Sequence, residues 1–157
     1  MFTICKATIE DIPILEDLQK QLHGTPFEES HNDLKTTITQ GHVWIVVESP
    51  EDGETPPLHK KSIVGYGLCE LFDRDQKNFP NSIFLSELFV TPAHRSKGVG
   101  SLLVKTMLNE PWPKEYNYFS LTHDPNEPHL TEYYKKFGFT ECGKTDAENI
   151  KMIKPRS

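Results

Sequence analysis

Apolar positions along the chain follow two different periods, and the changes between them predict its secondary structure. Near the N-terminus, Ile12, Leu15, Leu18 and Leu22 lie on one stripe at helical spacing. Elsewhere, short runs rich in β-branched and aromatic residues are separated by polar loops, which is typical of strands. The predicted strands span Phe2–Lys6, Val43–Glu48, Ile63–Phe72, Ser82–Val90, Tyr118–Thr122, Phe139–Cys142 and Asn149–Ile153.

Four helices are predicted between these strands. The first carries the leucine stripe, and the capping-box pair Thr8 and Asp11 precedes it. The second begins at Ser30 and closes at Gly41, a residue type that commonly ends helices. The other two predicted helices span Ser96–Asn109 and Leu130–Phe137.

The order of these elements predicts the fold class. It reads β-α-α-β-β-β-α-β-α-β-β, and successive strands with no helix between them pair antiparallel. The helix between Ser82–Val90 and Tyr118–Thr122 makes a right-handed crossover, so those two strands should run parallel. We therefore expect an α/β fold with a mixed, mostly antiparallel sheet and helices on both faces. The 157 residues suit a single domain over 1–157.

Charge and composition narrow the class of function. Seventeen basic and twenty-three acidic residues give a formal net charge of −6, which argues against a nucleic-acid partner because phosphate binding needs a basic face. The longest apolar run, Val43–Val47, is far shorter than the roughly 20 residues of a membrane helix, so no membrane partner is expected. Three widely spaced cysteines without a CxxC pair argue against disulfides and a metal site, and they favour a reducing cytoplasm.

The segment with the clearest chemistry is Leu88–Leu103, LFVTPAHRSKGVGSLL. Within it, the hexapeptide Arg95–Gly100 leads from a predicted strand into a helix. The first N–H groups of a helix have no partner inside it and, with the helix dipole, attract an anion. The two glycines of the hexapeptide let a diphosphate approach the backbone, and its arginine and lysine add positive charge. The pattern therefore indicates a phosphate-binding turn.

Other glycine-rich loops fit this segment less well. A P-loop needs GxxxxGK[ST], but no lysine follows Gly100. A dinucleotide-binding fold needs GxGxxG, and neither Ser96 nor Leu103 supplies the missing glycine. A glycine-containing helix start with no ligand is the remaining alternative.

Three segments, in the right order, resemble one protein family. Arg95–Gly100 matches the pattern [RQ]xxGxG/A after a strand, Tyr134–Phe139 (YKKFGF) is similar to a late Y-x-K-x-G-F segment, and Lys6–Asp11 is similar to the family's opening. The chain thus resembles the GNAT family of N-acetyltransferases over nearly its whole length. The resemblance implies the acyl-CoA N-acyltransferase fold, acetyl-CoA as co-substrate and no metal.

The same resemblance implies how acetyl-CoA binds. The strand ending at Val90 would separate from the next parallel strand, and the pantetheine amides would pair with its backbone like an added strand. The residues implied for the pantetheine arm are Leu88, Phe89, Val90 and Asn126. Those implied for the pyrophosphate are Arg95, Ser96, Lys97, Gly98, Val99, Gly100 and Ser101. The alternatives are a fully paired core strand and a turn or capping role for the asparagine.

Acetyl transfer to an amine needs a neutral amine and a proton for the departing thiolate. Tyr134 matches the family tyrosine near the CoA sulfur, and a phenol keeps its proton at pH 7 and can donate it. Glu87 is the candidate base, because a carboxylate between Leu85 and Phe89 on one strand face is costly unless it is paired or functional. The alternatives are a packing tyrosine and a structurally paired glutamate, and some relatives carry the carboxylate at the position of Ser86. The histidines predicted to be solvated loop residues are His94, His123 and His129.

The acceptor is predicted to be a small cationic primary amine. The net charge of −6 favours cations. Phe27, Glu28 and Glu29 lie in the connection where family members often build acceptor specificity, and Ser62–Tyr66 gives a loose likeness to the diamine and polyamine acetyltransferases. We expect direct transfer in a ternary complex by a cytoplasmic enzyme, with a homodimer as a further prediction. The alternatives are a non-catalytic acyl-CoA-binding module and a nucleotide-phosphate binder.

Overall fold

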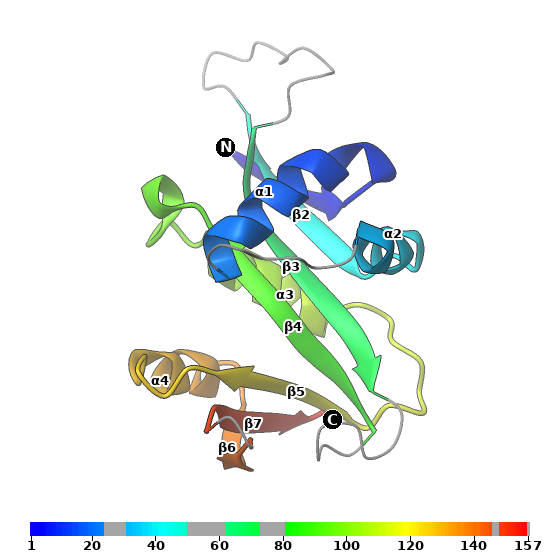
Figure 1. The fold of residues 1–157 in the computed structure, drawn as a ribbon. Helices are drawn as coiled ribbons and strands as arrows, with labels where there is room; N and C mark the ends of the chain where they lie inside the picture. Colours follow the sequence, from blue (N-terminus) through cyan, green and yellow to red (C-terminus); the bar gives the residue numbers. More distant parts are fainter. Residues whose placement is uncertain (24–30, 50–61, 73–80, 146–147, 157) are drawn as a thin grey trace. The chain divides into compact units, whose positions relative to one another are not determined.

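The structure is a computed structural model that describes residues 1–23, 31–49, 62–72, 81–145 and 148–156. Its strands and α-helices follow one another in the predicted order (Figure 1). The strands are β1 (Phe2–Lys6), β2 (Val43–Glu48), β3 (Ile63–Phe72), β4 (Ser82–Val90), β5 (Tyr118–His123), β6 (Thr140–Lys144) and β7 (Ile150–Pro155). The α-helices are α1 (Ile12–His23), α2 (His31–Thr39), α3 (Val99–Leu108) and α4 (His129–Lys135).

Hydrogen bonds join the strands into a seven-stranded sheet with the order β1-β2-β3-β4-β5-β7-β6. β1 pairs antiparallel with β2, and β2 pairs antiparallel with β3. β7 pairs antiparallel with both β5 and β6. β4 and β5 pair in parallel, from Ser82 opposite Tyr118 to Phe84 opposite Ser120. The predicted mixed, mostly antiparallel sheet and its parallel crossover are therefore confirmed.

Internal contacts divide the chain into two compact units, and each is described by itself. The N-terminal unit comprises Met1–Leu68 and Glu87–Met107, and the C-terminal unit comprises Cys69–Ser86 and Leu108–Ser157. Strands β3 and β4 contribute to both units. Helices α1 and α2 belong to the N-terminal unit, and helix α4 belongs to the C-terminal unit.

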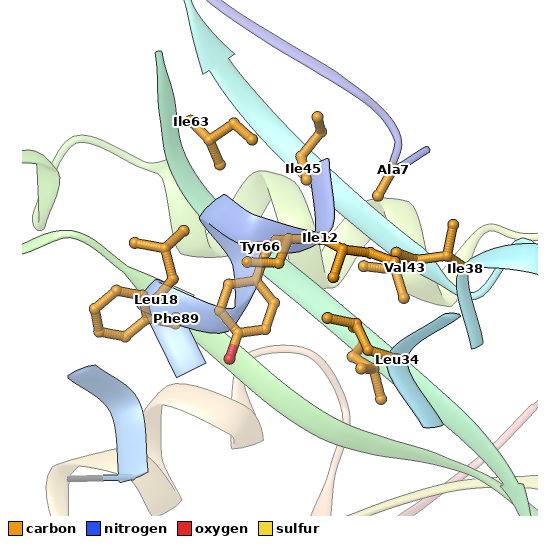
Figure 2. Packing of buried hydrophobic residues seen from close by; sticks show 12 residues of the cluster. Ala7, Ile12, Leu18, Leu34, Ile38, Val43, Ile45, Ile63, Tyr66 and Phe89 are labelled. Carbon is orange, nitrogen blue, oxygen red and sulfur yellow. The ribbon is translucent and has the colours of Figure 1, made fainter. Parts of the chain in front are cut away.

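Helices α1 and α2 bury their apolar stripes against the strands of the N-terminal unit (Figure 2). Leu15, from the predicted stripe, is fully buried, as are Ile45 and Tyr66 from the strands beneath it. The predicted capping pair is present, since the Thr8 N–H donates to Asp11 Oδ2 over 2.8 Å. The whole cluster comprises Ala7, Ile12, Leu15, Leu18, Leu34, Ile38, Val43, Ile45, Ile63, Tyr66, Leu68 and Phe89.

Helix α3 covers the opposite face of the same strands, and glycines on β3 leave room for it. Side chains alternate across a strand, so Gly65 and Gly67 face away from the side to which Tyr66 points. A Cβ at Gly65 would lie 3.0 Å from Val99 Cγ1, and a Cβ at Gly67 would lie 2.9 Å from Met107 Sδ. The predicted placement of helices on both faces is confirmed within this unit.

Ring stacking between β3 and β4 and the hydrogen bonds of Arg156 stabilise the C-terminal unit. Phe72 and Phe84 stack with ring centroids 4.4 Å apart. The Arg156 guanidinium donates to the carbonyls of Trp112 over 3.1 Å and of Tyr116 over 2.6 Å, which ties the end of β7 to the connection before β5. No helix in the described parts of the chain is long and apolar enough to cross a membrane.

Helix α4 ends earlier than the sequence predicts. Its last residue is Lys135, and not Phe137, because the chain tightens into a turn there. The N–H groups of Phe137 and Gly138 each donate to a carbonyl three residues back, over 3.0 Å. Gly138 then adopts a left-handed backbone with φ of 98°, which glycine allows without strain.

Candidate functional site

The connection from β4 to α3 is the turn that the sequence predicts to bind phosphate. Ser96 and Gly98 both have left-handed backbone, with φ of 66° and 85°. Such residues cannot continue a right-handed helix, so α3 begins at Val99 and the predicted start at Ser96 is wrong. The Leu102 N–H donates to Gly98 O over 3.0 Å at the beginning of the helix. The segment before Val99 is therefore a turn that ends in a helix N-terminus.

The start of α3 fits a diphosphate group. The first N–H groups of a helix lack partners inside the helix, and they carry the positive end of its dipole. A Cβ built on Gly98 would meet nothing within 4 Å, so the space over this backbone is open. Arg95 and Lys97 are exposed next to it and carry positive charge. The seven residues predicted for the pyrophosphate, Arg95 to Ser101, lie on this turn and on the first three positions of α3.

Arg95 folds back onto the strand that precedes the turn. Its Nε donates to Val90 O over 3.0 Å, and its guanidinium carbon lies 5.7 Å from the centroid of the Phe89 ring. The Thr91 N–H donates to Val64 O over 2.9 Å, which keeps the strand end attached to β3. These contacts hold the positive charge of Arg95 beside the turn.

His94 also holds the turn, and the prediction that it is a solvated loop residue is wrong. The residue ends a short 3-10 helix, Pro92–His94, and is half-buried. Its Nδ1 lies 2.7 Å from Thr91 Oγ1, and its Nε2 lies 2.5 Å from Glu48 Oε2. The imidazole therefore connects the turn to the end of β2.

The strand residues predicted for the pantetheine arm lie directly before the turn. The parallel register of β4 with β5 runs from Ser82 to Phe84, so Leu88–Val90 lies beyond it. Phe89 is buried in the apolar cluster, whereas Leu88 and Val90 are half-buried. The backbone of this strand end continues into the turn that the sequence predicts to bind phosphate.

Glu87 is buried and held by two polar side chains. Its exposed fraction is 8%. The Tyr66 hydroxyl donates to Glu87 Oε1 over 2.6 Å, and Gln19 Nε2 donates to Oε1 over 3.1 Å and to Oε2 over 3.4 Å. The predicted strand face is confirmed, since Leu85, Glu87 and Phe89 are all buried. The partners of Glu87 include a phenol and an amide, which the structural alternative does not name.

Sequence reasoning missed Tyr66 and Gln19, although each leaves a signal. Gln19 follows Leu15 by four residues, so a polar side chain interrupts the buried stripe of α1. Tyr66 places a phenol in the otherwise apolar run IVGYGL. A buried polar group needs a hydrogen-bonding partner, so Glu87, on a predicted strand, is a natural partner to consider for both residues. The pattern could not show that these particular residues meet.

Tyr134 lies on α4 in the C-terminal unit, among aromatic rings. Its ring centroid is 6.0 Å from that of Phe139, 5.2 Å from that of Tyr133 and 6.4 Å from that of His123. Burial raises the pKa of the Tyr134 phenol, and the charges of Tyr133 and Glu127 raise it further. The phenol is therefore fully protonated at neutral pH, as a proton donor must be.

His123 is a buried structural residue, so the prediction of a solvated loop histidine is wrong here too. Its Nδ1 lies 3.0 Å from the Asp124 carbonyl oxygen, which only accepts, so Nδ1 carries a proton. Its Nε2 lies 2.9 Å from Thr131 Oγ1. The imidazole joins the end of β5 to the first half of α4, the helix that carries Tyr134. His129, by contrast, is exposed, as predicted, but it is the first residue of α4 and not a loop residue.

The other predicted residues divide between the turn after β5 and parts outside the described ranges. Asn126 is exposed, and its N–H donates to Asp124 Oδ1 over 2.8 Å. It therefore lies in a turn, and Pro128 rather than Asn126 caps α4. Phe27, Glu28 and Glu29 lie outside the described residues.

The N-terminal unit thus brings Glu87, the strand end Leu88–Val90 and the turn Arg95–Ser101 together on one continuous stretch of chain. Tyr134 and Asn126 belong to the C-terminal unit. Among the residues described, no three His, Cys, Asp or Glu side chains are grouped as metal ligands would be.

Comparison with known proteins points to one family. The model of the acetyltransferase (GNAT) family matches residues 12–139. No curated protein matches the chain. Among solved structures, a GNAT-family acetyltransferase from Staphylococcus aureus MU50 has a TM-score of 0.75 at 13% identity, covering 100% of both chains. The NatC complex bound to Gag peptide and CoA gives a TM-score of 0.74 at 15% identity over 98% of each chain. An acetyltransferase of the same family from Bacillus cereus ATCC 10987 gives 0.67 at 23% identity, over 98% of this chain and 94% of the other.

Proposed function

The chain belongs to the GNAT family of acetyltransferases, and from this premise we propose that it moves the acetyl group of acetyl-CoA to a primary amine by direct transfer in a ternary complex. The observation that carries the proposal is the turn before α3. It combines left-handed Ser96 and Gly98, open space over the glycine and two exposed cations at a helix N-terminus. These are the features that a diphosphate-bearing acyl donor requires.

The donor is proposed to lie along the end of β4 and the turn. The pyrophosphate would accept hydrogen bonds from the backbone of Ser96–Ser101, with the charges of Arg95 and Lys97 beside it. The pantetheine amides would pair with the backbone of Leu88–Val90, as an added strand pairs with a sheet edge. Asn126 is the further residue proposed for the pantetheine arm. In this binding mode, backbone groups of the protein would hold acetyl-CoA and place its thioester, so that side chains remain available for acid–base chemistry.

Glu87 and Tyr134 are proposed as base and acid. An alkylammonium with a pKa near ~10 is neutral only about one part in a thousand at pH 7, which costs roughly 4 kcal/mol. Glu87, through a water molecule, would take the proton that the ammonium loses. The amine nitrogen then forms a bond to the acetyl carbon, and the C–S bond breaks. Tyr134 would give its proton to the departing thiolate, and the second proton, which the nitrogen loses as it becomes an amide, would pass through water to restore the Tyr134 phenol. The raised pKa of Tyr134 keeps the phenol protonated before transfer and also makes it a weaker acid, so it supports the supply of a proton and not the acid strength of the phenol.

A small cationic amine is the proposed acceptor, bound beside Phe27, Glu28 and Glu29. The net charge of −6 supports a cation. A peptide N-terminus is the second candidate, since the similar NatC structure contains Gag peptide with CoA. These two classes of acceptor differ in charge. A diamine carries two positive charges near neutral pH, whereas a peptide presents one α-amino group next to an amide.

Two measurements test the proposal together. Calorimetry with coenzyme A should give a heat of binding, and thiol release from acetyl-CoA should rise with one class of acceptor in a panel of polyamines, aminoglycosides, amino acids and peptides. Polyamines are expected to be the best acceptors. Absence of heat with coenzyme A would reject the donor site. Binding of coenzyme A without thiol release for any amine would instead favour the non-catalytic acyl-CoA-binding module.

A further inference from the structure

Three polar side chains converge inside the apolar cluster of the N-terminal unit. They are Gln19 from α1, Tyr66 from β3 and Glu87 from β4, with exposed fractions of 3%, 0% and 8%. The hydroxyl of Tyr66 is 2.6 Å from Glu87 Oε1, and the amide nitrogen of Gln19 is 3.1 Å from the same oxygen. Figure 2 shows Tyr66 and Phe89 within this cluster, and their ring centroids are 6.2 Å apart.

Both partners present hydrogen-bond donors to the carboxylate oxygens of Glu87. The Tyr66 hydroxyl and the Gln19 amide each donate to Oε1, and the amide also reaches Oε2 over 3.4 Å. The separation of 2.6 Å between Tyr66 and Glu87 lies at the short end of the range for O–H···O bonds. Donors that come from two different elements and reach both oxygens fix the rotation of the Glu87 carboxylate.

The location of the cluster connects it to the acetyl donor. Glu87 lies three residues before Val90 on the strand that runs into the phosphate-binding turn, and Phe89 on the same strand face contacts both the Tyr66 ring and Arg95. A base must be held in one geometry relative to the reacting atoms, because a misplacement of about 1 Å can cost about 100-fold in rate. Tyr66, Glu87 and the strand end proposed for the donor thus lie on the neighbouring strands β3 and β4, and Gln19 reaches Glu87 from α1.

We infer that Tyr66 and Gln19 are positioning residues that hold the Glu87 carboxylate in the orientation in which it accepts the proton of the acceptor amine. The inference rests on the proposed function, since it assumes acetyl transfer to an amine. Neither side chain needs to touch a substrate: both act through Glu87. The cluster accounts for two polar residues buried in a cluster that is otherwise apolar.

The first test uses single substitutions that keep shape. Tyr66→Phe removes only the hydroxyl, and Gln19→Met keeps the side-chain length but removes the donor. At pH 7 we expect Tyr66→Phe to lower kcat about tenfold or more, and Gln19→Met to lower it less, with KM for acetyl-CoA changed by less than about twofold. Tyr118→Phe on β5 and Gln21→Met on α1 are matched controls that should leave kcat unchanged. Gln21 is exposed, and its Nε2 donates to Asp17 Oδ2 over 3.3 Å on the same helix.

Two further readouts separate positioning from a structural role. Near pH ~9.5 a large share of the acceptor amine is neutral without any base, so the losses in Tyr66→Phe, Gln19→Met and Glu87→Gln should shrink together. In a Glu87→Gln background, Tyr66→Phe should cause little further loss, because both changes remove the same function. A purely structural role predicts an equal fold-loss at both pH values and in both backgrounds. Coenzyme A calorimetry on each variant checks that it is folded.

The outcomes distinguish this inference from the proposed function. If the unaltered protein releases no thiol with any amine, the proposed function fails and the inference fails with it. If it is active but the losses multiply in the double variant, or persist unchanged at high pH, only the positioning role is overturned. Full activity of Glu87→Gln would likewise overturn it while leaving acetyl transfer itself established.

Discussion

At the scale of single residues, environment decides which chemistry each titratable group can perform. The Tyr134 phenol lies against Phe139, Tyr133 and His123, and burial is the main cause of its raised pKa. Such a phenol is a poor base near neutral pH and a reliable proton store. Glu87, in contrast, accepts hydrogen bonds from Tyr66 and Gln19, which hold its carboxylate in one orientation. The two surroundings therefore suit the different roles proposed for the two residues.

Replacing Tyr134 by Phe tests the acid. We expect kcat to fall about 100-fold or more, because the thiolate must then leave without a positioned proton donor, whereas the affinity for acetyl-CoA should change little. Steady-state thiol release and calorimetry measure the two quantities. Tyr133→Phe, on the neighbouring position of α4, is the control and should retain activity. Equal turnover of Tyr134→Phe and the unaltered protein would remove Tyr134 from the mechanism.

The raised pKa of Tyr134 also predicts how activity depends on pH. The protonated phenol is the active form, and a raised pKa extends that form to higher pH, so deprotonation of Tyr134 should not reduce kcat below about pH 10. Activity should instead rise from pH 7 to about pH 9.5 as the acceptor amine loses its proton. A fall in kcat centred near pH 8–9 that is absent in Tyr134→Phe would contradict this assignment.

At the scale of elements, backbone conformation shapes the donor site. Ser96 and Gly98 have left-handed backbone and turn the chain just before α3, and the space next to Gly98 is open. Glycine adopts this conformation without steric cost, whereas other residues do not. The sequence pattern predicted the turn and the helix but not their boundary. The reason is that Ser96 carries no signal for a positive φ, so the helical pattern from Val99 was extended three residues too far.

Gly98→Ala tests this element. The added Cβ meets no protein atom within 4 Å but forces a side chain into backbone with φ of 85°, which costs about 1 kcal/mol of stability. It also occupies the space proposed for the diphosphate, so we expect the dissociation constant of coenzyme A to rise about tenfold or more. Gly143→Ala is the matched control, since its φ is 138° and its Cβ is equally unobstructed, but it lies on β6. Equal coenzyme A affinity in both variants would argue against the proposed donor site.

The helix α1 offers a prediction about stability. Leu15 is fully buried in the cluster of the N-terminal unit, whereas Ile14 on the other side of the same helix is 36% exposed. Leu15→Ala removes apolar contacts and leaves a cavity, so the free energy of unfolding should fall by about 2–5 kcal/mol. Ile14→Ala should lower it by much less. Urea unfolding of the two variants measures the difference, and similar values would show that the helical stripe is not the buried face.

At the scale of the whole molecule, periodicity predicted the fold more completely than the site. Apolar patterns and turn residues gave the first four strands at their observed bounds, and the crossover rule gave the parallel pair. A turn leading into a helix was also predictable between β4 and α3, since its signal lies in six consecutive residues, whereas phosphate binding by this turn stays a prediction. The Gln19–Tyr66–Glu87 cluster was not predictable. Gln19 precedes Glu87 by 68 positions and Tyr66 precedes it by 21, so tertiary packing alone brings the three side chains together. The bonds of His94 and His123 were missed for the same reason, since Glu48 is distant in sequence and Thr131 is reached through a turn.

Net charge is a property of the whole chain, and it predicts how the reaction with a cationic acceptor depends on ionic strength. A molecule of charge −6 attracts a cationic acceptor through a field that salt screens, with a Debye length of about 30 Å at 0.01 M and about 8 Å at 0.15 M. For a diamine acceptor, kcat/KM should therefore fall about threefold or more between these ionic strengths, whereas a monoamine of equal length should lose less. The measurement is thiol release at limiting acceptor and saturating acetyl-CoA, so that changes in donor binding do not enter. Equal salt dependence for the two amines, or preference for a neutral or anionic amine over both, would show that the acidic charge does not select the acceptor.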